Sequence, residues 1–156
     1  AVNWDGVDFG LYGGFGRRSK RDPLRKHVRG GITDNGLTAA LYRRAAIGLN
    51  LYRQAKTLEP ASERVTTAES LNPRAVELAA CGCFTLSDAR AEVKEVFGEL
   101  VPTFETAKEL EELVRYYLAH PAERLELAAQ LPARVEGRTF DALGRQVIER
   151  LEGYGG

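Results

Sequence analysis

Short apolar runs alternate with longer amphipathic stretches over the first two thirds of the chain. Four of these runs are too short for helices and are rich in aliphatic and aromatic side chains, which is typical of buried strands. They span 7–12, 47–52, 83–86 and 100–104, and a further short strand is expected at 27–29. Between them lie polar, glycine-rich segments that we interpret as loops.

The amphipathic stretches predict six helices, three between strands and three after the last strand. Asn72 and Pro73 are typical of a helix start, because Asn caps the first turn and Pro fits the first helical position. Gly82 and Gly98 stand where helices end, and Pro132 is expected to kink or shorten its helix. The expected helices span 37–45, 74–80, 89–97, 106–119, 122–135 and 139–151.

This order of elements predicts the α/β fold class. Strands that alternate with helices pair in parallel through right-handed crossovers, so we expect a Rossmann-like parallel sheet flanked by helices. The chain would end in a helical C-terminal segment, and residues 1–156 would form a single domain. Ligands of such sheets lie at the carboxyl ends of the strands. Segments 13–20 and 50–53, and the loop before Asn72, fall at those ends.

Composition adds few constraints to this picture. With 44% hydrophobic and 28% charged residues, the chain is not a disordered tail, a collagen-like fibre or a disulfide scaffold. The sequence shows no signal peptide and no membrane-spanning run, which needs about 18 apolar residues. Cys81 and Cys83 suit reduced core thiols, so we expect a cytoplasmic protein. The chain begins without methionine, and we expect a fragment of a longer protein.

Charge is balanced overall but not locally. The 22 basic and 22 acidic residues cancel, which argues against a general nucleic-acid binder. Residues 1–31 carry seven basic and three acidic residues, whereas the other 125 carry 15 and 19. This surplus predicts a local anion site, with a solvated loop as the alternative.

The loop after the first strand combines glycines with cations. Gly13 and Gly14 would let the backbone approach a ligand closely, and Arg17, Arg18 and Lys20 could neutralise a diphosphate. The loop matches neither the P-loop motif nor the dinucleotide-binding glycine motif. A glycine hairpin with surface arginines remains an alternative.

Two glutamates bracket the start of the expected helix at 74–80. Glu69 precedes the helix and Glu77 lies inside it, while the helix N-terminus offers N–H groups and partial positive charge for a phosphate. A carboxylate can accept hydrogen bonds from two neighbouring sugar hydroxyls. The alternative makes Glu69 a solvent-facing residue and Glu77 an ordinary ion-pair partner of Arg74.

One pattern in the chain resembles the nucleotide-sugar signature of GT-B glycosyltransferases. In it, seven residues separate Glu69 from Glu77, and Ala80-Cys81-Gly82 follow before a strand. The resemblance is greatest to the CgeB-type (spore-maturation) group and strongest over 72–82. Segments 7–13, 41–50 and 116–124 add to it in the same order. It implies the C-terminal, donor-binding half of the two-domain fold, with the N-terminal acceptor domain absent from this chain.

The resemblance also implies roles for individual residues. Glu77 would hold the ribose of a nucleoside diphosphate sugar, and Glu69 would contact the donor sugar as the catalytic residue. Asn72, Pro73 and Arg74 would lie at the diphosphate, with backbone amides over 71–74 facing its phosphates. The donor-binding residues implied are Gly13, Gly14, Arg17, Arg18, Lys20, Asn72, Pro73, Arg74 and Glu77.

The resemblance implies chemistry that needs no metal and no cofactor, because cations and the helix dipole replace the metal. In the glycosyltransferases that the chain resembles, this pattern of two glutamates is commoner among retaining enzymes, so the resemblance implies a retaining transfer to an unknown acceptor. One departure is the polar segment 62–68, where a strand is expected; Arg64 or Arg74 is then an alternative to the basic loop. A non-catalytic module that binds nucleotides or sugar phosphates is the alternative function. A response-regulator-like domain is disfavoured by the lack of an aspartate cluster.

Overall fold

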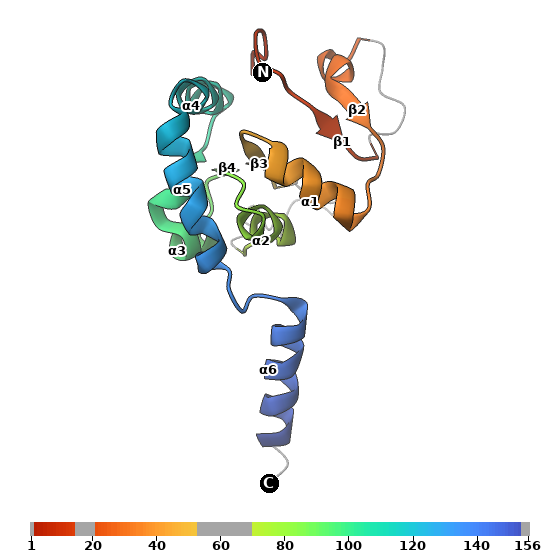
Figure 1. Ribbon diagram of the computed structural model, residues 1–156, viewed down its shortest axis with the longest axis vertical. Coiled ribbons are helices and arrows are strands. Elements are labelled where there is room, and N and C mark those ends of the chain that lie inside the picture. The colour runs from red at the N-terminus through yellow and green to blue at the C-terminus, as the bar shows by residue number, and fades with distance from the viewer. Residues whose placement is uncertain (1, 15–20, 53–69, 154–156) are drawn as a thin grey trace, which may run out of the picture.

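The structure is a computed structural model that describes residues 2–14, 21–52 and 70–153 (Figure 1). Over these ranges the chain is mixed α/β, with parallel strands and six α-helices, as the sequence predicts. The strands are β1 (Leu11–Tyr12), β2 (Val28–Gly30), β3 (Gly48–Asn50), β4 (Thr85–Asp88) and β5 (Thr103–Phe104). The helices are α1 (Asn35–Arg44), α2 (Pro73–Ala80), α3 (Ala91–Phe97), α4 (Ala107–Ala119), α5 (Pro121–Arg134) and α6 (Phe140–Gly153). Two 3₁₀ turns, η1 (Pro23–His27) and η2 (Gly98–Leu100), complete the described elements.

The described strands form two parallel sheets rather than one. In the larger sheet β4 is central, with Leu49 of β3 opposite Leu86 and Thr103 of β5 opposite Ser87. Helix α2 lies between β3 and β4 in sequence, and α3 lies between β4 and β5, which is the βαβ arrangement of a Rossmann-like half. Strands β1 and β2 pair only with each other among the described residues.

The first strand is shorter than the expected 7–12. The N–H of Val7 donates to the carbonyl of Trp4 at 3.0 Å, and the N–H of Phe9 donates to the carbonyl of Val7 at 2.9 Å. These local turns use backbone groups that a sheet ladder would need, so the strand is confined to Leu11–Tyr12.

The helix ends follow the signals in the sequence. The side chain of Asn72 accepts from the N–H of Ala75 at 2.9 Å, and Pro73 occupies the first turn of α2. Thr106 and Glu109 form a reciprocal capping box at the start of α4. Pro132 does not end α5, which continues to Arg134.

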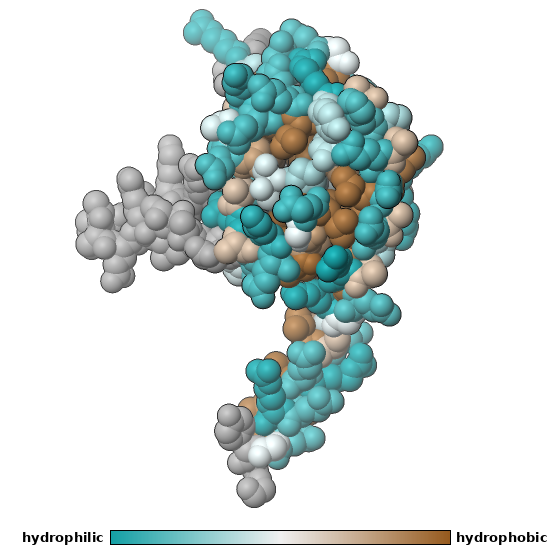
Figure 2. Space-filling model, turned by 90° about the vertical axis from the view of Figure 1, so that its left-hand side faces the viewer, coloured by the Kyte–Doolittle hydropathy of each residue, from teal (hydrophilic) through white to brown (hydrophobic). Residues whose placement is uncertain are grey.

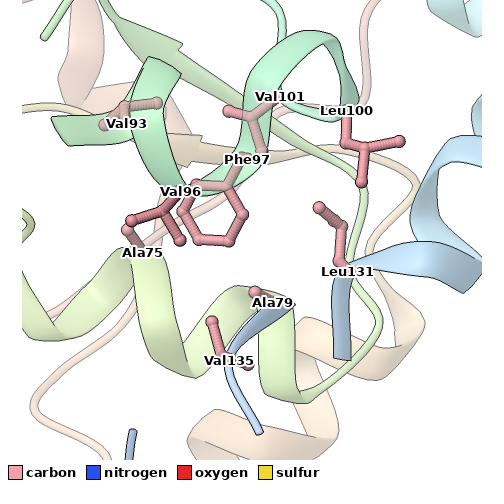
Figure 3. Close-up of a cluster of buried hydrophobic side chains, with 9 residues drawn as sticks. All are labelled: Ala75, Ala79, Val93, Val96, Phe97, Leu100, Val101, Leu131 and Val135. Carbon is pink, nitrogen blue, oxygen red and sulfur yellow. The ribbon is translucent and has the colours of Figure 1, made fainter. Parts of the chain in front are cut away.

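Two hydrophobic clusters fill the core. The first joins α2, α3 and the end of α5, and Figure 3 shows Phe97 and Leu131 pointing into it. The second joins β4 and β5 to α4 and α5, with Phe84 packed against the ring of Tyr117 at 4.4 Å between centroids. Helix α5 contributes to both clusters and therefore ties the two sides together.

Strand β3 and helix α2 approach each other closely at Gly48. A Cβ atom added there would lie 2.6 Å from Leu78 Cδ2 and 3.0 Å from Cys83 Sγ, so the approach requires glycine. Both cysteines are free thiols, and burial raises the pKa of Cys83 to about 11. Cys83 is buried, as expected, whereas Cys81 is partly exposed.

Helix α6 projects from the rest of the structure (Figures 1 and 2). None of its residues is buried, and Phe140 and Leu151 are 81% and 67% exposed. No helix of the described ranges is long and apolar enough to span a membrane.

We expect Leu131→Ala to destabilise the protein by about 2–5 kcal/mol, because Leu131 is fully buried between α2, α3 and α5 and its loss leaves a cavity. Leu125→Ala is the matched control, since Leu125 lies in the same helix at 64% exposure and should change stability by less than about 0.5 kcal/mol. Urea unfolding followed by circular dichroism measures both. Equal effects of the two substitutions would contradict this core.

Candidate functional site

A hollow of about 460 Å³ lies at the N-terminus of α2, beside the carboxyl end of β3. Three parts of the chain supply its lining: α1, the residues after β3, and the first turns of α2. The lining residues are Tyr42, Leu51, Tyr52, Asn72, Pro73, Arg74 and Glu77. The hollow therefore occupies the position at which parallel α/β sheets bind ligands.

Side chains fix the entry of the chain into α2. The N–H of Asn72 donates to the Tyr52 hydroxyl at 3.0 Å, and the N–H of Leu71 donates to the Glu92 carboxylate. Two of the amides expected to face phosphates are thus used inside the protein, and Pro73 has no N–H. Of the backbone amides over 71–74 that were expected to face a ligand, only the N–H of Arg74 remains a candidate.

Arg74 and Glu77 are both exposed to the hollow. No ion pair joins Arg74 and Glu77 in the part of the chain that the structure describes. The alternative hypothesis, in which Glu77 only forms an ion pair with Arg74, is therefore not supported. Instead, both lie near the phenol of Tyr42. Burial raises the pKa of Tyr42, the Glu77 carboxylate raises it further, and a hydrogen bond and the charge of Arg74 lower it. A cation, a carboxylate and a phenol thus share one exposed surface.

Beneath this surface, the carboxyl ends of β3 and β4 carry buried polar groups. The fully buried Asn50 amide donates to the Ser87 hydroxyl at 3.1 Å, and that hydroxyl donates to the carbonyl of Asp88 at 3.1 Å. The side-chain oxygen Oδ1 of Asn50 has no hydrogen-bond partner. Such groups order the strand ends below the hollow.

The structure unites only part of the predicted site. Asn72, Pro73, Arg74 and Glu77 line one hollow, as expected. Arg17, Arg18, Lys20 and Glu69 lie outside the described residues.

The two glycines of the first loop lie elsewhere. Gly13 and Gly14 follow β1 in the other sheet and do not line the hollow at α2. Gly13 has a φ of 137° and its N–H donates to the carbonyl of Gly30 at 3.2 Å. The backbone conformation beside β2 thus explains why residue 13 is a glycine. Contact of Gly13 or Gly14 with a ligand stays a prediction.

A second surface hollow, of about 530 Å³, lies at residues 21–26, in the N-terminal part of the chain that carries the surplus of basic residues. It is lined by Arg21, Asp22, Pro23, Arg25 and Lys26. The Lys26 ammonium lies 3.7 Å from the Asp5 carboxylate, so neighbouring acidic groups offset part of the positive charge.

Tyr42, Leu51 and Tyr52 complete the lining of the hollow at α2. Segment 50–53 was expected near a ligand from its place after a strand. Leu51 and Tyr52 of this segment line the hollow, and their contact with a ligand stays a prediction. Tyr42 lies in the expected helix at 37–45, for which the sequence predicted no site residue, so its place in the hollow was missed.

Among the described residues, no three His, Cys, Asp or Glu side chains gather in a way that could hold a metal ion. The lining of the hollow instead offers one guanidinium and one helix N-terminus for an anion, and one carboxylate for hydroxyl groups.

Comparison with known proteins gives one match. A family model described as glycosyl transferase-like matches residues 1–147, which is nearly the whole chain. No curated protein and no solved structure matches.

We expect Glu77→Gln to lower the pKa of Tyr42, because the Glu77 carboxylate disfavours the phenolate. At pH values well below 10 the phenol stays protonated in both proteins, and the difference appears only on raising the pH. Nuclear magnetic resonance of the tyrosine ring carbons against pH measures it. Glu126→Gln, an exposed site on α5, should leave the titration of Tyr42 unchanged. An unchanged pKa of Tyr42 in Glu77→Gln would contradict the electrostatic interaction between Tyr42 and Glu77.

Proposed function

The chain belongs to the glycosyl transferase-like family, and from this premise we propose that it binds a nucleoside diphosphate sugar for transfer of the sugar to an acceptor. The observation that supports the proposal is the hollow at α2, where a helix N-terminus, Arg74 and Glu77 face the same space. A diphosphate needs positive charge and N–H donors, whereas a ribose needs a carboxylate acceptor. Arg74 supplies its guanidinium and its backbone N–H, and Glu77 supplies the carboxylate about one turn further along α2.

In this proposal, Arg74 and the start of α2 hold the diphosphate. The guanidinium of Arg74 is exposed and has five N–H donors, so besides its hydrogen bond to the Tyr42 phenol it can donate to phosphate oxygens. Glu77 accepts from the two ribose hydroxyls. The rings of Tyr42 and Tyr52 border the same hollow and give it apolar walls beside the charged groups.

The proposed reaction breaks the bond between the anomeric carbon of the sugar and the diphosphate oxygen. The acceptor hydroxyl forms the new glycosidic bond and loses its proton, and the nucleoside diphosphate leaves with the bonding electron pair. The protein contributes by stabilising the negative charge that develops on the leaving oxygen. We propose that cations do this without a metal, with Arg17, Arg18 or Lys20 assisting Arg74.

Glu69 is proposed to contact the donor sugar as the catalytic residue, with retention at the anomeric carbon. We further propose that residues 1–156 are the donor-binding half of a CgeB-type enzyme, and that a separate N-terminal domain binds the acceptor. A cytoplasmic location fits the two free thiols, Cys81 and Cys83.

We expect one of UDP, GDP, ADP and TDP to raise the melting temperature without added metal. At about 100 times its dissociation constant, a ligand adds roughly 2.7 kcal/mol to the free energy of unfolding. Glu77→Gln should weaken that nucleotide about tenfold or more, because a charged hydrogen-bond acceptor contributes about 1.5–3 kcal/mol. Glu126→Gln is the matched control and should bind as the wild type does. Equal binding by both variants would contradict the role of Glu77.

We expect Glu69→Ala to keep the affinity for the nucleoside diphosphate and to lose discrimination between its different sugars. Glu69 is proposed to contact the sugar and not the nucleotide, so only sugar-dependent affinity should fall. Isothermal titration with the diphosphate and with two of its sugar derivatives separates these effects. Unchanged sugar discrimination would remove Glu69 from the site and favour a non-catalytic nucleotide-binding module.

A further inference from the structure

Tyr52 connects the end of β3 to the start of α2. Its hydroxyl accepts a hydrogen bond from the N–H of Asn72 at 3.0 Å, while its ring lines the hollow beside Arg74 and Glu77. The orientation of this ring therefore sets where α2 begins relative to β3. Whatever holds Tyr52 also holds the first turn of the helix.

Two residues at the end of β4 and just after it, Asp88 and Arg90, contact Tyr52. The guanidinium carbon of Arg90 lies 4.9 Å from the centre of the Tyr52 ring, within the range of a cation–π contact. Asp88 pairs with Arg90 at 3.1 Å, and its carboxylate faces the N–H of Tyr52 at 3.4 Å. The side chains of Arg90 and Asp88 are only 16% and 23% exposed, so water screens this pair weakly.

The segment after β4 makes a second tie to the same point. Glu92, at the start of α3, accepts from the N–H of Leu71, which directly precedes Asn72. The two successive backbone amides that lead into α2 are thus held by side chains from outside the helix. None of the residues Asp88, Arg90 or Glu92 lines the hollow itself.

We propose that Arg90, paired with Asp88, is a positioning residue that fixes Tyr52 and through it the ligand-binding end of α2. Arg90 acts through Tyr52 and does not touch the ligand. Its value for donor binding rests on the proposed function, whereas its control of the α2 entry does not. Amide exchange at Asn72 therefore reports on the α2 entry directly, and ligand affinity is measured separately.

The test compares Arg90→Met with Arg115→Met. Arg115 also forms an ion pair at 3.1 Å, with Glu111 on α4, so its substitution removes a similar pair away from the hollow. Amide hydrogen exchange measured by nuclear magnetic resonance reports on the N–H of Asn72. The N–H of Cys83, which donates to the carbonyl of Leu78 at 3.0 Å, reports on the packed end of the same helix.

We expect Arg90→Met to speed exchange at Asn72 by about threefold to tenfold, the size of a partly desolvated cation–π contact, with exchange at Cys83 unchanged. Arg90→Lys keeps a cation beside Asp88 and should return exchange at Asn72 toward the wild-type rate. Tyr52→Phe, which lacks the hydroxyl that accepts from Asn72, should match Arg90→Met. Arg115→Met should leave both amides unchanged.

Exchange at Asn72 that is equal in Arg90→Met and Arg115→Met would overturn the proposal, and so would equal acceleration at Asn72 and Cys83, which would indicate general destabilisation. Titration with UDP, GDP, ADP and TDP forms the separate arm, in which Arg90→Met should weaken the bound nucleotide about threefold to tenfold. If none of them binds the wild-type chain, the proposed function fails while the exchange data still decide the role of Arg90. Unchanged affinity together with faster exchange would confine Arg90 to the α2 entry and overturn its role in donor binding.

Discussion

The close packing of α2 against β3 is the constraint on which the site depends. Gly48 has no side chain, and the space that a Cβ would occupy is filled by Leu78 of α2 and by Cys83. Leu78 is only 1% exposed and cannot move aside without disturbing the core. Gly48 begins β3 and Leu78 lies near the end of α2, so this contact holds the helix close against the strand. At their other ends, the residues after β3 and the first turns of α2 border the same hollow.

The charged groups of the hollow are exposed, whereas the polar groups at the nearby strand ends are buried. Arg74 and Glu77 face outward and carry the charges that a sugar nucleotide would meet. The groups at the ends of β3 and β4, Asn50 and Ser87, are buried and neutral, and the Asn50 amide donates to the Ser87 hydroxyl. One cation and one carboxylate thus lie together at the hollow of a protein whose basic and acidic residues cancel.

Much of the fold could be predicted, because it depends on local signals. The start of α2 follows from Asn72 and Pro73, and the parallel pairing follows from short apolar runs separated by helices. The expected strand at 7–12 was too long, since turns near Val7 use the backbone groups that pairing needs. The separation of β1 and β2 from the larger sheet among the described residues could not be predicted, because strand pairing depends on contacts distant in sequence.

The site could be predicted after β3 and at the start of α2, where its residues directly follow the ends of recognisable elements. Asn72, Arg74 and Glu77 share the start of one helix, so their spacing places them together. Tyr42 reaches the same hollow from α1, and nothing in a single sequence shows which face of that helix meets α2. The roles implied for Glu69, Arg17, Arg18 and Lys20 stay predictions, because these residues lie outside the described ranges.

The exposed helix α6 has a thermodynamic consequence for the chain. Its 14 residues bury no side chain, so their helical state depends on the balance of helix nucleation and propagation rather than on packing. Isolated helices of about that length are marginal in water, and their helix–coil equilibrium shifts gradually with temperature. Ellipticity should therefore decline with a sloping baseline before the packed core melts cooperatively, and a surface that covers Phe140 and Leu151 would remove that slope.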